Sequence, residues 1–332
     1  MASSNDVAKR AGVSQSTVSR VLNGAESVNP KTRQKVLQAI EELRYRPNLI
    51  ARSLVTKSTK TIAMVSGSIL NPFFAETTDS IVQYASQKGY NVTVSFDEEL
   101  TSNWLETAIG NSVDGILLSS LKLDDPVFED LQRSGVPYML YNRKPQIGGN
   151  YVVLDNALAG ELVAKHLLDL GHSRIAYISK SGNISTFKER FTGFIQAVNS
   201  EALTVDSDLV YFLDFPEVEV EKVVWKLMNG PKPPTAILCA NDAIALQCMD
   251  ALLSIGLNIP EDVSLAGIDN IKIASHRAIR LTSVGHEKYQ MGEIAVESLI
   301  NMIEGIEDTS TPKQIVLKPE LVVRNTTCKA RC

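Results

Sequence analysis

The amino-terminal stretch 6–23 constrains the fold more than any other part of the chain, because two short helical patterns meet there at one glycine. Apolar residues recur at helical spacing on either side of Gly12, first Val7, Ala8 and Ala11, then Val18, Val21 and Leu22. Ser14 lies three residues before Thr17 and can cap its backbone amide. The pattern predicts two short helices joined by a tight turn.

The second of these helices carries polar side chains opposite its apolar face: Gln15, Ser16, Ser19 and Arg20. Such side chains have the length, donors and acceptors needed to reach base edges in a DNA major groove. The plainer alternative is a helical hairpin whose polar face only meets water. The sequence leaves both readings open at this point.

The following segment favours the DNA-binding reading. Asn29 and Pro30 are typical of a helix N-cap and first helical residue. The apolar residues of this third helix are Val36, Leu37, Ile40 and Leu43. They can complete a small three-helix core.

Charge is distributed unevenly along the 332-residue chain, whose formal net charge is −5. Residues 1–60 contain eleven basic and four acidic side chains and carry +7, so the remainder carries −12. A basic end on an acidic body is typical of a protein that contacts phosphate groups through one end. The length predicts two or three domains.

No apolar run approaches the roughly 20 residues that span a bilayer, and the first residues lack the basic and then apolar order of a signal peptide. We therefore expect a cytoplasmic protein without a membrane partner. The four cysteines, Cys239, Cys248, Cys328 and Cys332, form no disulfide framework. Cys328 and Cys332 could form a metal pair, but a loose tail is favoured because no histidine is near.

Three amino-terminal segments, at 6–23, 31–36 and 45–48, resemble the DNA-binding headpiece of the lac/gal/purine repressor family. In that family a hinge helix follows the headpiece, which corresponds to residues 49–57 here. The resemblance implies that Leu54 is an apolar wedge placed between base pairs in the minor groove. One departure is Ser4, where relatives carry an apolar residue. By this resemblance the DNA-contacting residues are Ser14, Gln15, Ser16, Thr17, Ser19, Arg20, Asn23, Lys31, Arg33, Asn48, Ala51, Arg52 and Leu54.

After residue 60 the pattern changes to alternating strands and helices, which predicts α/β units with parallel sheets. The first unit has strands at 61–65, 91–96, 115–118 and 138–141 and helices at 74–88, 105–109 and 127–133. The second has strands at 174–178, 209–211, 236–240 and 263–266 and helices at 157–170, 187–199, 218–228 and 243–255. After 281–284, a helix at 289–303 precedes strands at 315–317 and 321–323. Two lobes with a ligand cleft between them are expected.

Six motifs in the body follow the order and spacing of the same family, at 171–172, 190–194, 240–245, 260–264, 267–269 and 281–284. The resemblance implies a body like a periplasmic sugar-binding protein, with three crossings between lobes and the helix after Val284 returning to the first. We expect a small all-α helix-turn-helix headpiece at 1–46, a hinge helix and linker at 47–60, and an α/β periplasmic-binding-protein-like body of two parallel-sheet lobes at 61–332. The first lobe is expected at about 61–154 and 287–314, the second at about 155–284 and 315–326.

Ligands of such sheets bind at the carboxyl ends of the strands. By motif position, the effector-contacting residues would be Phe73, Ser119, Asn142, Thr186, Arg190, Phe215, Asn241, Asp269 and His286. Arg190 with Asp269 can bind vicinal hydroxyl groups, or Arg190 alone can bind an anion. The alternative is an interlobe salt bridge without a ligand role. Phe73 and Phe215 either stack on the ligand or belong to the core, and His286 is expected to hydrogen-bond rather than to transfer protons.

Asn142 stands where some sugar-responsive relatives have an aspartate, and Arg143 follows it. With one carboxylate fewer, Arg190 would be less compensated, which favours an anionic ligand. We therefore expect a sugar acid or sugar phosphate rather than a neutral sugar. A purine stacked between Phe73 and Phe215 is the rival.

Together these observations predict a sequence-specific DNA-binding transcriptional repressor whose operator affinity is controlled by a small metabolite. We expect a homodimer on a pseudo-palindromic operator, because the chain ends nine residues after Val323, without the extra helix that joins dimers in the tetrameric lac branch. The alternatives are a purine-type corepressor ligand, a protein co-effector, or an exported nutrient-binding protein. Neither an enzyme nor a cofactor or metal is expected, since no phosphate loop, activated nucleophile or metal cluster is evident.

Overall fold

Chain contacts divide the protein into two compact units, Met1–Thr59 and Lys60–Cys332. The computed structural model describes residues 2–22, 25, 27–45, 58–96, 102–110, 112–214, 216–286, 288–307 and 310–331. The division falls within one residue of the expected start of the body at residue 61. The hinge helix expected at 49–57 lies outside the described residues. No helix in the described part of the chain is long and apolar enough to cross a membrane.

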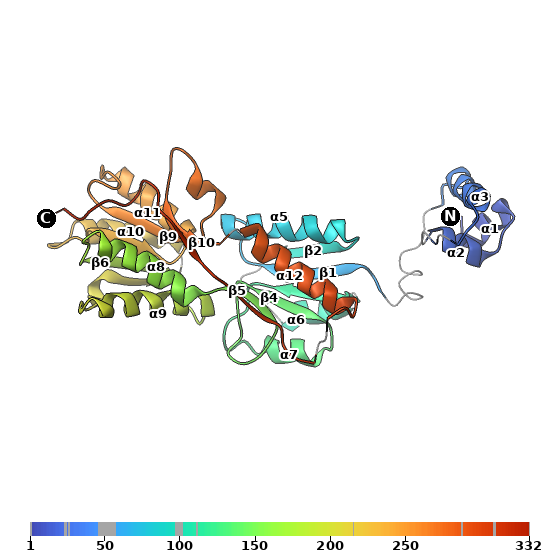
Figure 1. The fold of residues 1–332 in the computed structure, drawn as a ribbon, viewed down its shortest axis with the longest axis horizontal. Coiled ribbons are helices and arrows are strands. Elements are labelled where there is room, and N and C mark those ends of the chain that lie inside the picture. Colours follow the sequence, from blue (N-terminus) through green and yellow to red (C-terminus); the bar gives the residue numbers. More distant parts are fainter. Residues whose placement is uncertain are drawn as a thin grey trace. The chain divides into compact units, whose positions relative to one another are not determined.

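The amino-terminal unit consists of the helices α1 (Ser4–Ala11), α2 (Gln15–Leu22) and α3 (Pro30–Glu42), labelled in Figure 1. A capping box between Ser3 and Asp6 begins α1. Gly12 ends it with a φ of +67°, a conformation that suits glycine. The hydroxyl of Ser14 accepts a hydrogen bond from the amide of Thr17 at 3.2 Å. The two predicted helices and their glycine turn are confirmed.

One valine from each helix forms the centre of this unit: Val7, Val18 and Val36 are fully buried. Leu37 was predicted to join them, but it is 52% exposed and Ala39 is buried instead. The reason is helical rotation, since neighbouring residues point about 100° apart and Val36 already faces the core. The predicted cap of α3 is present, because Asn29 accepts a hydrogen bond from the amide of Lys31 at 2.9 Å.

Two six-stranded sheets form the body, one in each lobe (Figure 1). The first has the order β11-β5-β4-β3-β1-β2, and its strands all pair in parallel. They are β1 (Thr61–Ser66), β2 (Asn91–Phe96), β3 (Gly115–Leu118), β4 (Tyr138–Tyr141), β5 (Tyr151–Leu154) and β11 (Gln314–Leu317). The second has the order β12-β10-β9-β8-β6-β7, with β12 antiparallel to β10. The strands of the second sheet are β6 (Ile175–Lys180), β7 (Val210–Leu213), β8 (Ala236–Cys239), β9 (Ser264–Ile268), β10 (Thr282–Gly285) and β12 (Glu320–Val322).

Helices cover both sheets, so the strands β3, β4, β8 and β9 are buried along their whole length. The first lobe contains α5 (Pro72–Gln87), α6 (Ser102–Gly110), α7 (Val127–Arg133) and α12 (Lys288–Ile303). The second contains α8 (Asn156–Asp169), α9 (Ser185–Ser200), α10 (Pro216–Met228) and α11 (Asp242–Ser254), with 3-10 turns at Ser207–Leu209 and Lys272–Ser275.

The chain crosses between the lobes three times, after β5, after β10 and between β11 and β12, as predicted. The prediction that the helix after Val284 returns to the first lobe is also confirmed, because α12 packs on α5, β3 and β4. Figure 1 shows α12 lying beside α5 in that lobe.

The strand β11 corrects the predicted lobe boundaries, which assigned residues 315–317 to the second lobe. It forms the edge of the first sheet and pairs in parallel with β5, a strand that was not predicted, from Gln314 beside Tyr151 to Leu317 beside Leu154. The direction of the chain explains this. Helix α12 ends near Gly115, at the amino end of β3. The chain must therefore return along the first sheet before it can cross, and β12 then enters the second sheet antiparallel.

The carboxyl-terminal residues pack on the second lobe instead of forming the loose tail that the sequence suggested. The amide of Ala330 donates to the carbonyl of Leu170 at 2.8 Å. His172 donates through Nε2 to the carbonyl of Cys328 at 2.9 Å and accepts at Nδ1 from the hydroxyl of Thr235 at 2.9 Å. Burial lowers the pKa of His172 below its ordinary value. The folded protein therefore favours the neutral imidazole.

We predict that protonation of His172 destabilises the body. A histidine with a lowered folded-state pKa binds more protons in the unfolded chain, so its contribution is complete above the ordinary pKa of about 6.5 and declines as the pH falls through the folded value. The melting temperature of His172→Gln should fall less than that of the wild type between about pH 7.5 and about pH 5.5. His276→Gln, at an exposed position, is the control and should keep the wild-type slope. Equal slopes in all three proteins would contradict the prediction.

Candidate functional site

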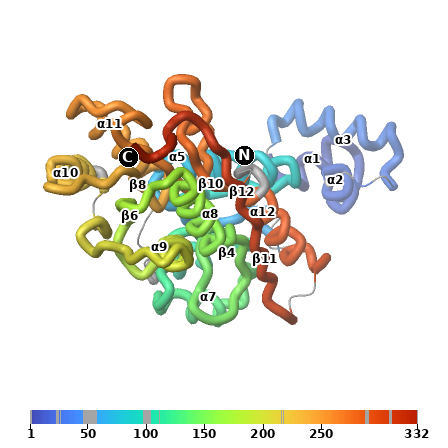
Figure 2. Tube along the Cα trace, turned by 60° about the vertical axis from the view of Figure 1, so that its left-hand side comes forward, coloured from blue at the N-terminus to red at the C-terminus, as the bar shows by residue number. Residues whose placement is uncertain are grey.

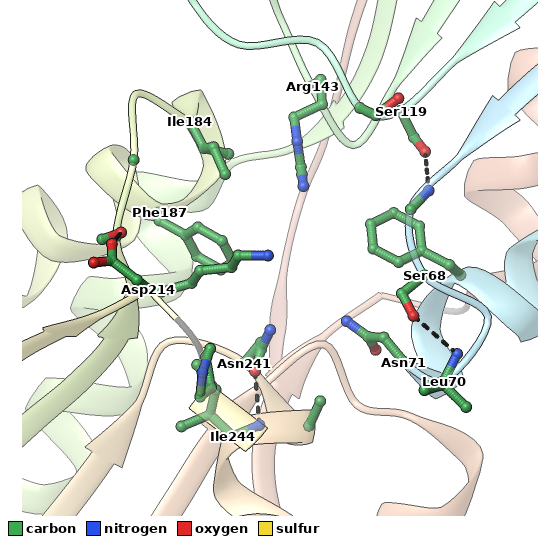
Figure 3. A pocket seen from close by; sticks show the side chains of 18 of the residues that line it. Ser68, Leu70, Asn71, Ser119, Arg143, Ile184, Phe187, Asp214, Asn241 and Ile244 are labelled. Atoms are coloured by element: carbon green, nitrogen blue, oxygen red, sulfur yellow. Dashed lines mark hydrogen bonds between the residues drawn. The ribbon is translucent and has the colours of Figure 1, made fainter. Parts of the chain in front are cut away.

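A cavity of about 530 Å³ lies between the two lobes, at the carboxyl ends of the strands. The first lobe supplies the segments after β1, β3 and β4, and the second those after β6, β7 and β8. In Figure 3, Asn71 and Ser119 of the first lobe face Phe187 and Asn241 of the second across this space. A cavity of this size suits a small metabolite.

Polar contacts join the lobes around the cavity. They include the hydrogen bonds from Leu123 N to Asn183 O (2.9 Å), from Arg143 Nη1 to Thr186 Oγ1 (3.1 Å) and from Lys272 N to Glu76 Oε1 (3.0 Å), and the ion pair of Lys144 Nζ with Glu189 Oε1 (2.5 Å). Each is a small contact whose net contribution to stability is modest. Together these contacts stabilise one arrangement of the two lobes. A change in the angle between the lobes would break them.

Arg143 lies at the centre of this junction, two residues after β4, and is 7% exposed. Its guanidinium carbon is 5.8 Å from the ring centre of Phe74 and 6.0 Å from that of Phe187. Phe74 belongs to the first lobe and Phe187 to the second, so aromatic faces from both lobes flank the cation. Figure 3 shows the side chain of Arg143 pointing into the cavity.

The cavity has an excess of positive charge. Lys122, Arg143 and Lys180 line it, and Asp214 is the single carboxylate among its described lining residues. The carboxylate of Asp214 accepts a hydrogen bond from the hydroxyl of Ser181. In a partly enclosed space, where water screens less, this imbalance favours an anion.

Two buried side-chain oxygens of the lining have no hydrogen-bond partner within the described part of the chain, the Oγ of Ser120 and the Oε1 of Gln247. A buried polar atom without a partner carries a free-energy cost, which a bound molecule can remove. Both oxygens can accept a hydrogen bond. A ligand that carries hydroxyl groups therefore complements them.

Arg190 and Asp269 do meet, but inside the second lobe. Nη2 of Arg190 is 2.8 Å from Oδ1 of Asp269, and their side chains are 2% and 5% exposed. Nε donates to Asn156 at 2.9 Å, and Nη1 donates to the carbonyl of Ala240 at 2.6 Å. The interlobe salt bridge considered from the sequence is therefore wrong. So is the argument that Asn142 leaves Arg190 under-compensated, because Asp269 supplies the counter-charge.

Seven of the predicted effector-contacting residues line one of two cavities. Ser119 and Asn241 line the 530 Å³ cavity. Five others line a separate, narrow crevice: Phe73, Asn142, Arg190, Asp269 and His286. Thr186 lies at the lobe junction, where it binds Arg143. Phe215 lies outside the described residues.

The sequence reasoning missed the charged and aromatic side chains that distinguish the cavity: Phe74, Arg143, Lys180 and Asp214 among them. Lys180 is the last residue of β6, and Asp214 directly follows β7. The rule that ligands bind at the carboxyl ends of parallel strands was therefore a sufficient signal for both.

On the amino-terminal unit, most described DNA-contacting candidates are exposed: Ser14, Gln15, Ser16, Ser19, Arg20 and Lys31. Thr17 is half-buried, and Arg33 is partly engaged because its Nη2 donates to the carbonyl of Ala25 at 2.6 Å. Gln15 donates to the hydroxyl of Ser4 at 3.0 Å, so a polar contact joins α1 to α2. Asn23, Asn48, Ala51, Arg52 and Leu54 lie outside the described residues.

Comparison with known proteins matches both units. Residues 5–48 match the model of bacterial regulatory proteins of the lacI family, and residues 164–327 match the periplasmic binding protein-like domain. The HTH-type transcriptional repressor PurR of Aliivibrio salmonicida is 33% identical, with 99% of this chain and 100% of the relative covered. PurR of Glaesserella parasuis serovar 5 is 34% identical, with 98% of each covered.

Solved structures show the same relationship. The lac repressor bound to ONPG in the repressed state aligns with a TM-score of 0.85 at 28% identity and covers 98% of this chain and 99% of that one. A complex of the transcriptional regulator CelR with cellobiose aligns with a TM-score of 0.72 at 30% identity and covers 98% and 100%.

A helix-turn-helix unit followed by a two-lobed binding-protein body defines the class of DNA-binding transcriptional repressors controlled by a small-molecule effector, and this protein is one of them. It is not an enzyme. The chain belongs to the lacI family of bacterial regulatory proteins.

We predict that Asp269→Ala lowers the free energy of unfolding by about 3–5 kcal/mol, because it leaves the buried guanidinium of Arg190 without its counter-charge. Glu129→Ala removes one partner of an exposed ion pair with Arg133 and should cost less than about 1 kcal/mol. Urea unfolding followed by circular dichroism measures both. Similar losses in the two variants would show that the buried pair does not stabilise the second lobe.

Proposed function

We propose that the effector is a small anion with several hydroxyl groups, such as a sugar acid or a sugar phosphate, and that it binds in the cavity between the lobes. The observation that carries this proposal is the cluster of Lys122, Arg143 and Lys180 opposed by Asp214. Lys122 and Arg143 come from the first lobe and Lys180 from the second, so one anionic group can interact with cations of both.

The rest of the lining supports a hydroxylated body for this ligand. The Oγ of Ser120 and the Oε1 of Gln247 accept hydrogen bonds from its hydroxyl groups. Phe74 and Phe187 supply aromatic faces for the apolar side of a sugar ring. Ser119 and Asn241, which the sequence also predicted, complete the lining.

A purine corepressor is the second candidate. It is favoured by the two PurR relatives, which are 33% and 34% identical over nearly the whole chain. In this cavity a purine would stack on Phe74 or Phe187, rather than between Phe73 and Phe215 as the sequence suggested. The excess of positive charge has no role in binding a neutral base, which ranks this candidate second.

The operator contacts are assigned to the exposed polar face of α2. Gln15, Ser16 and Arg20 contact base edges, while Lys31 and the other basic residues contact phosphates. Leu54, by its resemblance, acts in the minor groove. A protein that regulates transcription works in the compartment that holds the DNA, which in a bacterium is the cytoplasm.

The functional form is assigned as a homodimer on a pseudo-palindromic operator. Exposed apolar side chains support a dimer face that involves both lobes: Leu70, Val82, Leu253, Ile255 and Ile273. Val82 belongs to α5 and Leu253 to α11, and these helices lie along one side of the body in Figure 1 and again in Figure 2. The lac repressor dimer bound to operator and the anti-inducer ONPF is a structural relative, with a TM-score of 0.85 at 28% identity. Effector binding would alter how paired first lobes present the hinge segments to DNA.

The effector proposal predicts a selective rise in melting temperature. Gluconate, glucose 6-phosphate, glucose and hypoxanthine would be compared, since a ligand at about 100 times its Kd adds about 2.7 kcal/mol to the free energy of unfolding. We expect shifts with the anions and none with glucose. Lys180→Gln should reduce them, while Lys165→Gln, which alters an exposed lysine outside the cavity, should not. A shift with glucose alone would refute the charge argument, and a shift with hypoxanthine alone would support the purine corepressor.

The DNA proposal predicts different effects for two exposed basic residues. Arg20→Ala should cost about 1–3 kcal/mol on the cognate operator and relax the preference at one base pair. Lys35→Ala should weaken binding to all duplexes by a similar factor and reduce the salt dependence, because a phosphate contact carries no sequence information. Operator titrations at several salt concentrations measure both. Loss of base preference in Lys35→Ala with none in Arg20→Ala would contradict the assignment.

A further inference from the structure

A second open groove lies on the second lobe, between α9 and β7, with a volume of about 400 Å³. Its apolar lining comes from Phe187 and Phe191 of α9 and Phe212 of β7. Strand β7 is the last strand of its sheet, so the described structure has no neighbouring strand beyond Phe212. That side chain is 50% exposed, which is unusual for an aromatic ring already packed on a core.

The aromatic rings of the groove form a corner. The centres of Phe191 and Phe212 are 5.2 Å apart and their planes meet at 82°. Phe191 continues inward to Tyr177, at 5.0 Å, so the corner is supported from behind. A flat ring that enters the groove can meet the face of one phenylalanine and the edge of the other, both of which are favourable aromatic contacts.

The polar rim of the groove is cationic. Lys180 and Lys188 line it, and no aspartate or glutamate occurs among its described lining residues. Lys188 donates to the neutral amide oxygen of Asn183, which does not cancel its charge. An anionic group on the ligand would therefore be attracted to this rim.

We propose that this groove is a second ligand site and that it binds a planar aromatic anion. It is distinct from the effector cavity, because Lys188, Phe191 and Phe212 line the groove and not the cavity. The segment Lys180 to Gly182 and Phe187 form part of both walls. A ligand in the groove thus holds one wall of the effector cavity, and by linkage each ligand changes the affinity of the other.

The test uses the full chain and the fluorescent probe 8-anilinonaphthalene-1-sulfonate, an aromatic anion. We expect Phe212→Ala and Lys188→Gln each to raise its Kd roughly two- to tenfold, the range set by losing one aromatic or charged contact. The neutral analogue N-phenyl-1-naphthylamine should be insensitive to Lys188→Gln. Both substitutions are at exposed positions, and melting curves check that each variant folds.

Two control variants separate this site from other surfaces. Lys165→Gln removes an exposed lysine that lines neither the groove nor the effector cavity, and Trp225→Ala removes a 60% exposed aromatic ring elsewhere on the same lobe. Both should bind the probe as the wild type does. Unchanged affinity in Phe212→Ala and Lys188→Gln would overturn the proposal, as would an equal loss of affinity in Lys165→Gln. Neither result depends on the identity of the effector, so the effector proposal is tested separately.

Discussion

The buried guanidinium of Arg190 is the interaction on which the ligand-facing edge of the second lobe depends. It joins α8 through Asn156, the end of β8 through the carbonyl of Ala240, and the end of β9 through Asp269. A charge with so little exposure is tolerated when each nitrogen of the guanidinium has a hydrogen-bond partner, so these segments keep one arrangement. Close packing of α8 against α9 places the side chain of Arg190 among these segments. A Cβ on Gly160 would lie 2.0 Å from the carbonyl oxygen of Arg190, so α8 and α9 can approach this closely because that position is glycine.

That arrangement reaches the effector cavity through the backbone. Arg190 holds the carbonyl of Ala240, and the next residue, Asn241, caps α11 by accepting a hydrogen bond from the amide of Ile244 at 2.8 Å. Asn241 and Ile244 both line the cavity. Arg190 therefore positions cavity residues from behind, in addition to any contact it makes in its own crevice. The family motif around Arg190 did not predict this effect on the cavity. The effect depends on which backbone segments lie together in the folded protein.

The contrast between what the sequence predicted and what it missed follows from the range of the interactions involved. The cap at Asn29, the turn at Gly12 and the buried strands β3 and β4 depend on a few neighbouring residues, and all were predicted. Strand β5 was missed, and β11 was predicted as a strand but assigned to the wrong lobe, because the pairing of these two strands is settled by the path of α12 and not by neighbouring residues. The charge of the cavity is equally non-local, since Arg143 and Lys180 line the same space only when the two lobes lie together.

The distribution of charge between the lobes also limits how a ligand can act. Lys122 and Arg143 belong to the first lobe, and Lys180 and Asp214 to the second. An anion that interacts with cations of both lobes gains most where these side chains are close, which is the arrangement that also keeps the ion pair of Lys144 with Glu189. It therefore stabilises the closed lobes relative to open ones by its difference in affinity for the two. A neutral ligand that contacts one lobe alone binds the open and the closed lobes with equal affinity. However tightly it binds, it leaves the equilibrium between the open and closed forms unchanged.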